Sequence, residues 1–556
     1  MAIFKTKDLT YYYPNNEEPA INNLNVEVNE GEMILLVGPS GCGKSTLLKV
    51  FAGLVPNFYG GVIGGEVWFK DREIKRLKKT LVPQVGIMFQ DPEKQLVMTT
   101  VEREIAFGME NLGYPLTVMK RKLAETLDFI GIRDLVGRKV VELSAGQKQK
   151  VVLAGVLAMS PEILLLDEPT SQMDPISAEE LLNTIRKLAE DTGKTIIIAE
   201  QKLERCLHLA DRVIAMKEGK IIFQGEAKAY CNWAIANDFE FIPSIPRLFG
   251  GCGLEDIPLT VKQGRMAISK KLGDAIQKPK VDEHLLKVNN SRAGKRKQKE
   301  KPEIKVKNLW FSYESKQDVL KNINLEICKG QFVAILGQNG AGKSTLVKNF
   351  NGLLKPSRGE IEIQSQTLKG KSVYELSKKI GFLGQNPDNY LLNDTVEEEI
   401  KYTLNNFKLE WSKNTDNLLE KLGLDQYKSR NPRDLSTGQK QRTALASVLS
   451  VCPDILILDE PTRGMDYKRK SKLGKFLHEL KMRGTTIVLI THDIEFAVEY
   501  CDRTVIMFNG EIVADGNKQE VLKDNLYYSS QINKLFYGIE EVVTFEEAMR
   551  LIEGAW

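Results

Sequence analysis

The chain has 556 residues, of which 42% are hydrophobic and 27% are charged, and its net charge is +4. This length exceeds one ordinary hydrophobic core, so about two to four domains are expected. The small net charge gives no reason to expect a nucleic-acid partner, the longest apolar runs are too short to cross a bilayer, and the seven scattered cysteines predict neither a disulfide framework nor a metal cluster.

The two halves of the chain repeat one another. Three stretches of the first half return in the same order in the second: GPSGCGKSTLLK from Gly38 as GQNGAGKSTLVK from Gly337, LSAGQKQK from Leu143 as LSTGQKQR from Leu435, and ILLLDEPTSQMD from Ile163 as ILILDEPTRGMD from Ile455. A repeat of this length predicts a tandem duplication of a whole domain. The predicted domains are residues 1–275 and 304–556, each ending in a C-terminal packing segment.

A charged segment, residues 276–303, separates the two predicted domains. It shows little apolar periodicity, so we expect a solvated linker. Its basic cluster, Arg292 to Lys301, could instead bind a phosphate-rich surface.

A phosphate-binding loop begins at Gly38, after an apolar strand and before a helix start. The spacing G-x-x-x-x-G-K-[ST] lets the backbone N–H groups and the helix N-terminus face phosphate oxygens. Lys44 would neutralise phosphate charge, and the Ser45 hydroxyl would reach Mg²⁺. The predicted ATP-binding residues of this loop are Gly38, Ser40, Gly41, Cys42, Gly43, Lys44, Ser45 and Thr46 in the first copy and Gly337, Asn339, Gly340, Ala341, Gly342, Lys343, Ser344 and Thr345 in the second.

A pair of carboxylates ends the buried strand ILLLDE in each half. Asp167 at the strand tip is predicted to hold Mg²⁺, directly or through water, and Glu168 to orient or deprotonate the attacking water. Asp459 and Glu460 repeat the pair. Two P-loops together with two acid pairs predict ATP and Mg²⁺ as the cofactors.

A short motif, LSAGQ or LSTGQ, stands just before an apolar helix in each half, where free N–H groups could meet a γ-phosphate. With these motifs the sequence resembles the ATP-binding cassette (ABC) ATPases, over nearly the whole chain except the linker. Both copies depart from the usual LSGGQ at the third position, Ala145 and Thr437, where a small side chain still permits close approach. The predicted signature residues are Ser144, Gly146, Gln147, Ser436, Gly438 and Gln439.

The resemblance implies the α/β fold class: two tandem nucleotide-binding domains, each with a RecA-like P-loop core, a small antiparallel β region and a helical subdomain. It also implies head-to-tail pairing of two cassettes, so that the signature of one closes over ATP on the P-loop of the other. Whether the chain pairs its own two halves or pairs with another chain stays open.

Further site residues are implied by the same resemblance. The aromatic residue that stacks on adenine maps to Tyr13, with Tyr11 and Tyr12 as alternatives, and to Tyr313 in the second half. The remaining implied residues are the lid glutamines Gln90 and Gln385, which sense Mg²⁺, and the D-loop aspartates Asp174 and Asp466. The implied metal-site residues are Ser45, Gln90, Asp167, Ser344, Gln385 and Asp459.

The stretches FQDPEKQLVMTTVEREIAFG and GQNPDNYLLNDTVEEEIKYT, which follow the lid glutamines, resemble the ATPases of energy-coupling-factor (ECF) importers. Gln95 matches the second glutamine of that family's pattern, whereas Tyr390 departs from it. The alternative is a soluble tandem ABC ATPase that acts on ribosomes. Those proteins usually carry a long helical linker, and the linker here contains Pro279 and Pro302, so it is a poorer helix.

An ECF-type importer implies particular partners and a particular location. The chain would work at the cytoplasmic face of a bacterial-type cell membrane, with an integral membrane scaffold subunit and a separate small membrane subunit that captures the solute. The solute would be a vitamin, a precursor or a metal ion. The chain would supply both ATPases of the importer.

One position differs between the two halves where the family uses a histidine that contacts the γ-phosphate. His492 in TTIVLITHDIE fills this place, whereas TIIIAEQKLE has Gln201. Glutamine donates a neutral hydrogen bond but does not become cationic. The predicted catalytic residues are Glu168 and Gln201 at site one, closed by Ser436–Gln439, and Glu460 and His492 at site two, closed by Ser144–Gln147. We expect site two to hydrolyse faster and site one mainly to hold ATP; the alternative is that Gln201 substitutes adequately.

Overall fold

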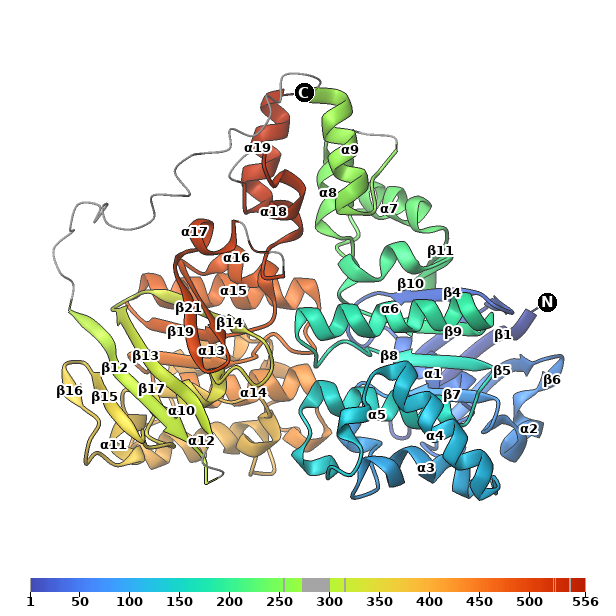
Figure 1. The fold of residues 1–556 in the computed structure, drawn as a ribbon, viewed down its shortest axis with the longest axis horizontal. Helices are drawn as coiled ribbons and strands as arrows, with labels where there is room; N and C mark the ends of the chain where they lie inside the picture. Colours follow the sequence, from blue (N-terminus) through green and yellow to red (C-terminus); the bar gives the residue numbers. More distant parts are fainter. Residues whose placement is uncertain are drawn as a thin grey trace. The chain divides into compact units, whose positions relative to one another are not determined.

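The computed structural model describes residues 2–253, 256–272, 301–314, 317–523, 525, 527–539 and 542–555. The chain forms two compact units, Met1–Ala267 and Ile268–Ala555, which Figure 1 draws in blue to green and in yellow to red. Most of the predicted linker, including all of its basic cluster except Lys301, lies outside the described residues. Its last two residues, 302–303, already belong to strand β12 (Pro302–Ser312).

A six-stranded sheet forms the centre of each unit. The strand order is β11-β10-β4-β9-β8-β7 in unit one and β21-β20-β14-β19-β18-β17 in unit two, so the duplication extends to topology. The edge strand β11 or β21 runs antiparallel to its neighbour, and the other neighbours are parallel. The bounds are β4 (Met33–Val37), β7 (Val85–Met88), β8 (Ile163–Asp167), β9 (Thr195–Ala199), β10 (Arg212–Lys217), β11 (Lys220–Gly225), β14 (Phe332–Gly337), β17 (Ile380–Leu383), β18 (Ile455–Asp459), β19 (Thr486–Ile490), β20 (Arg503–Phe508) and β21 (Glu511–Asn517).

The central strands are apolar throughout because both faces of the sheet are covered. Along β8, Leu164 and Leu166 enter one core cluster, which also includes residues of the helices α3–α6. Ile163 and Leu165 enter the cluster on the other face, with residues of α1 and of the antiparallel sheet. Strand β18 alternates between two clusters in the same way. This burial fixes the strand tips, where the acidic pairs stand.

A small antiparallel sheet accompanies each central sheet, with the order β2-β1-β5-β6 in unit one, where β3 also pairs with β1, and β13-β12-β15-β16 in unit two. The predicted antiparallel β region is therefore present in both units. The bounds are β1 (Ala2–Tyr12), β2 (Ile21–Leu24), β3 (Glu27–Asn29), β5 (Val62–Phe69), β6 (Arg72–Glu73), β13 (Asp318–Cys328), β15 (Arg358–Ile363) and β16 (Gln366–Thr367).

The helices of unit one include a mutually contacting group, α3, α4 and α5, which corresponds to the predicted helical subdomain. The helices of unit one are α1 (Lys44–Phe51), α2 (Ile74–Leu81), α3 (Val101–Asn111), α4 (Leu116–Ile130), α5 (Ala145–Ala158), α6 (Pro175–Thr192), α7 (Ala227–Ala236) and α8 (Ser244–Gly251). Helix α9 (Val261–Leu272) begins in unit one, and its residues from Ile268 onward belong to unit two. Unit two has α10 (Lys343–Phe350), α11 (Val373–Ser377), α12 (Val396–Asn406), α13 (Lys413–Lys421), α14 (Thr437–Leu449), α15 (Tyr467–Met482), α16 (Ile494–Tyr500), α17 (Lys518–Leu522), α18 (Gln531–Phe536) and α19 (Phe545–Ala555).

The two units differ after the fourth central strand. Helix α16 follows β19 in unit two, whereas two short 3₁₀ turns, Leu203–Arg205 and Leu207–Leu209, follow β9 in unit one. In unit two, Asp493 caps α16 by accepting a hydrogen bond from Phe496 N, at 3.2 Å. The end of each chain half carries a helix pair, α8 with α9 and α18 with α19, as Figure 1 shows.

A core substitution tests this arrangement. Leu458 of β18 is fully buried, so we expect Leu458→Ala to lower the free energy of unfolding of unit two by about 2–5 kcal/mol through lost burial and a residual cavity. The matched control is Leu353→Ala, at a leucine that is 52% exposed, which should change stability by less than about 0.5 kcal/mol. Urea titration measures both, and equal effects would contradict the assigned core.

Candidate ATP-binding and hydrolysis sites

The P-loop of each unit connects a buried strand to a helix. The backbone at Gly38 has φ +142°, and a Cβ there would lie 2.2 Å from the Met216 carbonyl oxygen, so no side chain fits. Gly337 shows the same restriction against the Met507 carbonyl oxygen, at 2.3 Å. The loop can therefore pass close to the neighbouring strand β10 or β20 and still open its N–H groups toward a ligand.

The P-loop lysines are folded onto their own loops. Lys44 Nζ donates to the carbonyl oxygens of Gly38 and Pro39, at 2.7 and 3.0 Å. Lys343 Nζ repeats this with Gly337, at 2.7 Å, and with the next carbonyl. Charged phosphate oxygens are stronger partners for a buried ammonium than neutral carbonyl oxygens are. Both lysines are thus placed for phosphate binding.

A hydroxyl and a carboxylate meet beside each P-loop. Ser45 Oγ donates to Asp167 Oδ1 at 2.9 Å, and Ser344 hydrogen-bonds Asp459. Burial raises the pKa of Asp167 and of Asp459, because each carboxylate is removed from water. Oxygen ligands of this kind suit Mg²⁺, which takes one or two carboxylates together with phosphate oxygens. These residues fit a magnesium ion bound with ATP, and the cation would offset the burial.

The second acid of unit one is held by two amides. Gln90 Nε2 donates to Glu168 Oε2 at 2.6 Å, and Gln201 Nε2 donates to Glu168 Oε1 at 2.5 Å. Burial raises the pKa of Glu168 to about 7, and the carboxylates of Asp167 and Glu200 push it in the same direction. Both carboxylate oxygens are therefore occupied by hydrogen-bond donors.

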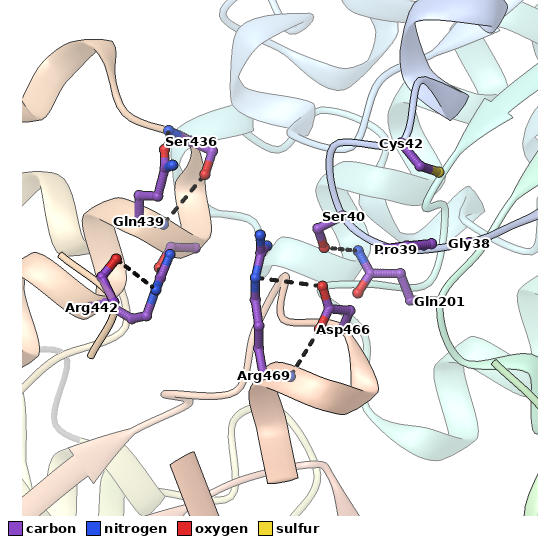
Figure 2. Close-up of polar contacts among 12 residues, drawn as sticks. Gly38, Pro39, Ser40, Cys42, Gln201, Ser436, Gln439, Arg442, Asp466 and Arg469 are labelled. Atoms are coloured by element: carbon purple, nitrogen blue, oxygen red, sulfur yellow. Dashed lines mark hydrogen bonds and ion pairs between the residues drawn. The ribbon is translucent and has the colours of Figure 1, made fainter. Parts of the chain in front are cut away.

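The second acid of unit two has a different neighbour. His492 Nε2 lies 3.5 Å from Glu460 Oε1 and 3.0 Å from Asn339 Oδ1. Gln201 in unit one likewise contacts the third P-loop residue, since its Nε2 donates to Ser40 Oγ at 3.3 Å, as Figure 2 shows. Gln201 and His492 thus occupy equivalent places between the P-loop and the acid, as the sequence alignment of the two halves predicted.

The signature residues begin helices α5 and α14. Ser144 Oγ accepts from Gln147 N at 3.3 Å, while Ser144 N donates back to Gln147 Oε1 at 3.0 Å. Ser436 and Gln439 form the same reciprocal cap, drawn in Figure 2. Because each side chain accepts a hydrogen bond from the backbone N–H of the other residue, the start of each helix is fixed by local contacts.

The D-loop aspartates also cap helices. Asp174 Oδ1 accepts from the N–H groups of Ile176 and Ser177, each at 3.1 Å. Asp466 Oδ1 accepts from Arg469 N at 2.9 Å, and its other oxygen lies 3.5 Å from Arg469 Nε, as seen in Figure 2. The structure therefore gives both residues a role inside their own unit.

The aromatic candidates separate by burial. Tyr11 is fully buried and donates to the Gly60 carbonyl oxygen at 2.7 Å, so it belongs to the core. Tyr13 stands against the P-loop helix, with its hydroxyl 3.2 Å from Thr46 Oγ1. Tyr313 has the same relation to Thr345, at 3.3 Å. Burial therefore assigns Tyr11 to the core, and the hydroxyl contact places Tyr13 beside the P-loop helix.

Sequence reasoning missed Glu200. This residue is 2% exposed, and its Oε1 accepts from Thr170 N and Thr170 Oγ1, at 3.1 and 2.6 Å. Its other oxygen accepts from Gln201 N at 3.1 Å. The carboxylate therefore ties the turn after β8 to Gln201. A glutamate at the end of the apolar run TIIIA was the available signal.

Two P-loops with acid pairs, on parallel sheets of this topology, define a P-loop ATPase with two nucleotide sites. The family model described as "ABC transporter" matches residues 21–171 and 320–463. A Bacillus anthracis protein named as an ABC transporter ATP-binding protein is 37% identical over 542 residues, covering 96% of this chain and 95% of that one. A Clostridium tetani protein of the same name is 40% identical over 453 residues, covering 82% of this chain and 100% of that one.

Solved structures also match. The cbiO1 protein of Clostridium perfringens, described as part of the ABC transporter complex cbiONQ, is 31% identical with a TM-score of 0.39, covering 45% of this chain and 99% of that one. On the family model and the curated relatives, the chain belongs to the ABC transporter family. It is an ATPase with two cassettes that uses ATP and Mg²⁺. Among the described residues, no helix has both the length and the apolar character needed to span a bilayer.

Nucleotide counting tests the two sites. We expect the double variant Glu168→Gln/Glu460→Gln, which should bind ATP without turnover, to hold two ATP per chain. Adding Lys44→Ala or Lys343→Ala should each reduce this to one, because a phosphate loses its buried cation. Equilibrium dialysis with labelled ATP gives the numbers. One ATP per chain before either lysine change would contradict the assignment.

Proposed function

We propose that this chain is the ATP-hydrolysing motor of an ECF-type importer, working at the cytoplasmic face of the membrane. A membrane scaffold subunit and a small solute-binding membrane subunit complete the importer. The observation that carries the proposal is the segment after each lid glutamine, which resembles that of ECF ATPases. In this segment Val97 and Leu392, at equivalent positions, are 66% and 64% exposed. Apolar side chains that are exposed at equivalent positions of both units suit the binding of a protein partner.

The catalytic step that we propose uses the residues in order. The P-loop N–H groups and Lys44 or Lys343 hold the β- and γ-phosphates. Asp167 or Asp459 would hold the Mg²⁺ bound with ATP, and that cation would supply neutralisation of phosphate charge. Glu168 or Glu460 accepts a proton from the attacking water. Gln201 or His492, which contacts both the P-loop and the acid, positions the γ-phosphate and the water.

The two sites are proposed to be unequal. At site one both oxygens of Glu168 accept amide hydrogen bonds, which stabilise the ionised carboxylate and make it a weaker proton acceptor. At site two the imidazole of His492 lies beside Glu460 and can carry charge, which glutamine cannot. We therefore propose head-to-tail sites in which site two, closed by Ser144–Gln147, hydrolyses faster. Site one, closed by Ser436–Gln439, mainly holds ATP.

Matched substitutions at the differing position test the inequality. In the assembled complex, His492→Ala should lower the ATPase rate by about 10²–10⁴-fold, because it removes a positioning group that can carry charge at the fast site. Gln201→Ala should lower the rate only a fewfold. Steady-state phosphate release measures both variants. Equal losses would mean that glutamine substitutes adequately and that the two sites are equivalent.

Partner capture tests the importer assignment. A polytopic membrane protein should co-purify with the tagged chain from native membranes, because binding to that protein would bury the exposed apolar residues Val97 and Leu392. A Val97→Asp/Leu392→Asp variant should lose this partner while still binding ATP, since both residues are exposed and lie outside the P-loops. Co-sedimentation with ribosomes, released by salt, would instead support the soluble alternative and contradict the importer.

A further inference from the structure

The two lid glutamines rest in different places. Gln90 is half-buried, and its side chain donates to Glu168 Oε2 at 2.6 Å. Gln385 is exposed, and within the described part of the chain its side chain makes no hydrogen bond. The strands that precede these residues, β7 and β17, have equivalent positions in their sheets. The cause of the difference should therefore lie in the turn that follows each strand.

In unit one a second glutamine closes this turn. Gln95 Nε2 donates to the Ile87 carbonyl oxygen at 2.9 Å, and Gln95 Oε1 accepts from Phe89 N at 3.0 Å. We call this pair of contacts the amide bridge. The amide bridge resembles the hydrogen bonding of a neighbouring parallel strand, because one side-chain amide pairs with the Ile87 C=O and the Phe89 N–H, which flank Met88. Gln90 follows Phe89 directly, so the hydrogen bond at Phe89 N also restrains the backbone position of Gln90.

In unit two a tyrosine takes this place, and it makes one bond where the glutamine makes two. Tyr390 Oη accepts from Gly384 N at 2.8 Å. A Cβ at residue 384 would lie 3.0 Å from Tyr390 Oη, so a side chain there would press on the hydroxyl. The pair Gly384 and Tyr390 is thus matched, as Phe89 and Gln95 are. Gln385 follows a glycine, which restricts the backbone less than phenylalanine does.

We propose that Gln95 and Tyr390 are positioning residues that set where each lid glutamine rests. The amide bridge keeps Gln90 at the acid of the first site, and the single tyrosine contact leaves Gln385 withdrawn from the second. This inference rests on the proposed function, in which the lid glutamine contacts Mg²⁺ bound with ATP. A lid glutamine already held beside the acidic pair needs less ordering to meet the metal, so the first site should bind the metal more tightly.

Metal binding at one site at a time tests the proposal. Mn²⁺ replaces Mg²⁺ as the probe, and electron paramagnetic resonance measures its binding to the full chain with saturating ATP. In a Lys343→Ala background, which leaves the first P-loop, Gln95→Leu should weaken Mn²⁺ binding by about 2- to 10-fold, as expected for loss of net hydrogen bonds. In a Lys44→Ala background, Tyr390→Gln should form an equivalent amide bridge in unit two and should tighten Mn²⁺ binding by a similar factor.

Two controls separate this role from damage to the fold. Lys94→Ala changes an exposed neighbour in the same turn and should leave Mn²⁺ binding unchanged. ATP affinity in excess EDTA should also stay unchanged in every variant, because the amide bridge does not contact the P-loop. Unchanged Mn²⁺ affinity in Gln95→Leu and Tyr390→Gln would overturn the proposal, and so would a matching loss of metal-free ATP binding. Failure of the Lys343→Ala protein to bind any ATP would instead overturn the proposed site.

Discussion

Each ATP site depends on one backbone turn at the end of a buried strand. Glu168 and Glu460 follow the strand aspartate with φ of 48° and 54°, a left-handed conformation that costs a non-glycine residue about 1–3 kcal/mol. The cost is offset because each N–H donates to the neighbouring strand, to Ala199 O at 2.8 Å and to Ile490 O at 2.9 Å. The turn places two carboxylates beside the P-loop, and it exists only while the sheet is intact.

The duplication kept this turn and changed what surrounds it. In unit one, amides of Gln90 and Gln201 hold Glu168, and buried Glu200 fastens the turn to Gln201. In unit two the residue equivalent to Glu200 is Thr491, whose hydroxyl accepts from Asp493 N at 3.0 Å and so supports the start of α16. The residue after the fourth central strand therefore supports Gln201, which hydrogen-bonds Glu168, in unit one. In unit two the equivalent residue supports the start of helix α16.

The sequence predicted the residues that a contiguous motif fixes. The P-loops, the acid pairs and the helix starts at Ser144 and Ser436 needed only local spacing, and the duplication aligned Gln201 with His492. Contacts between distant segments were not predictable in this way. In the sequence, Glu200 is only a polar residue that follows a strand, and its role becomes visible only from its burial in the structure. The departure at Tyr390 was visible, but its meaning required the hydrogen bond to Gly384 N, because main-chain contacts leave no sequence motif.

The central claim is that one chain carries two chemically unequal sites on one fold. The most direct measurement is rapid-quench hydrolysis of prebound radiolabelled ATP in the assembled complex, with two ATP loaded per chain and a chase of unlabelled ATP. We predict two phases, in which about half of the label is hydrolysed quickly and the other half is hydrolysed much more slowly or leaves as ATP, because charge and positioning groups control the rate of phosphoryl transfer. A single phase that consumes all of the label would contradict the claim.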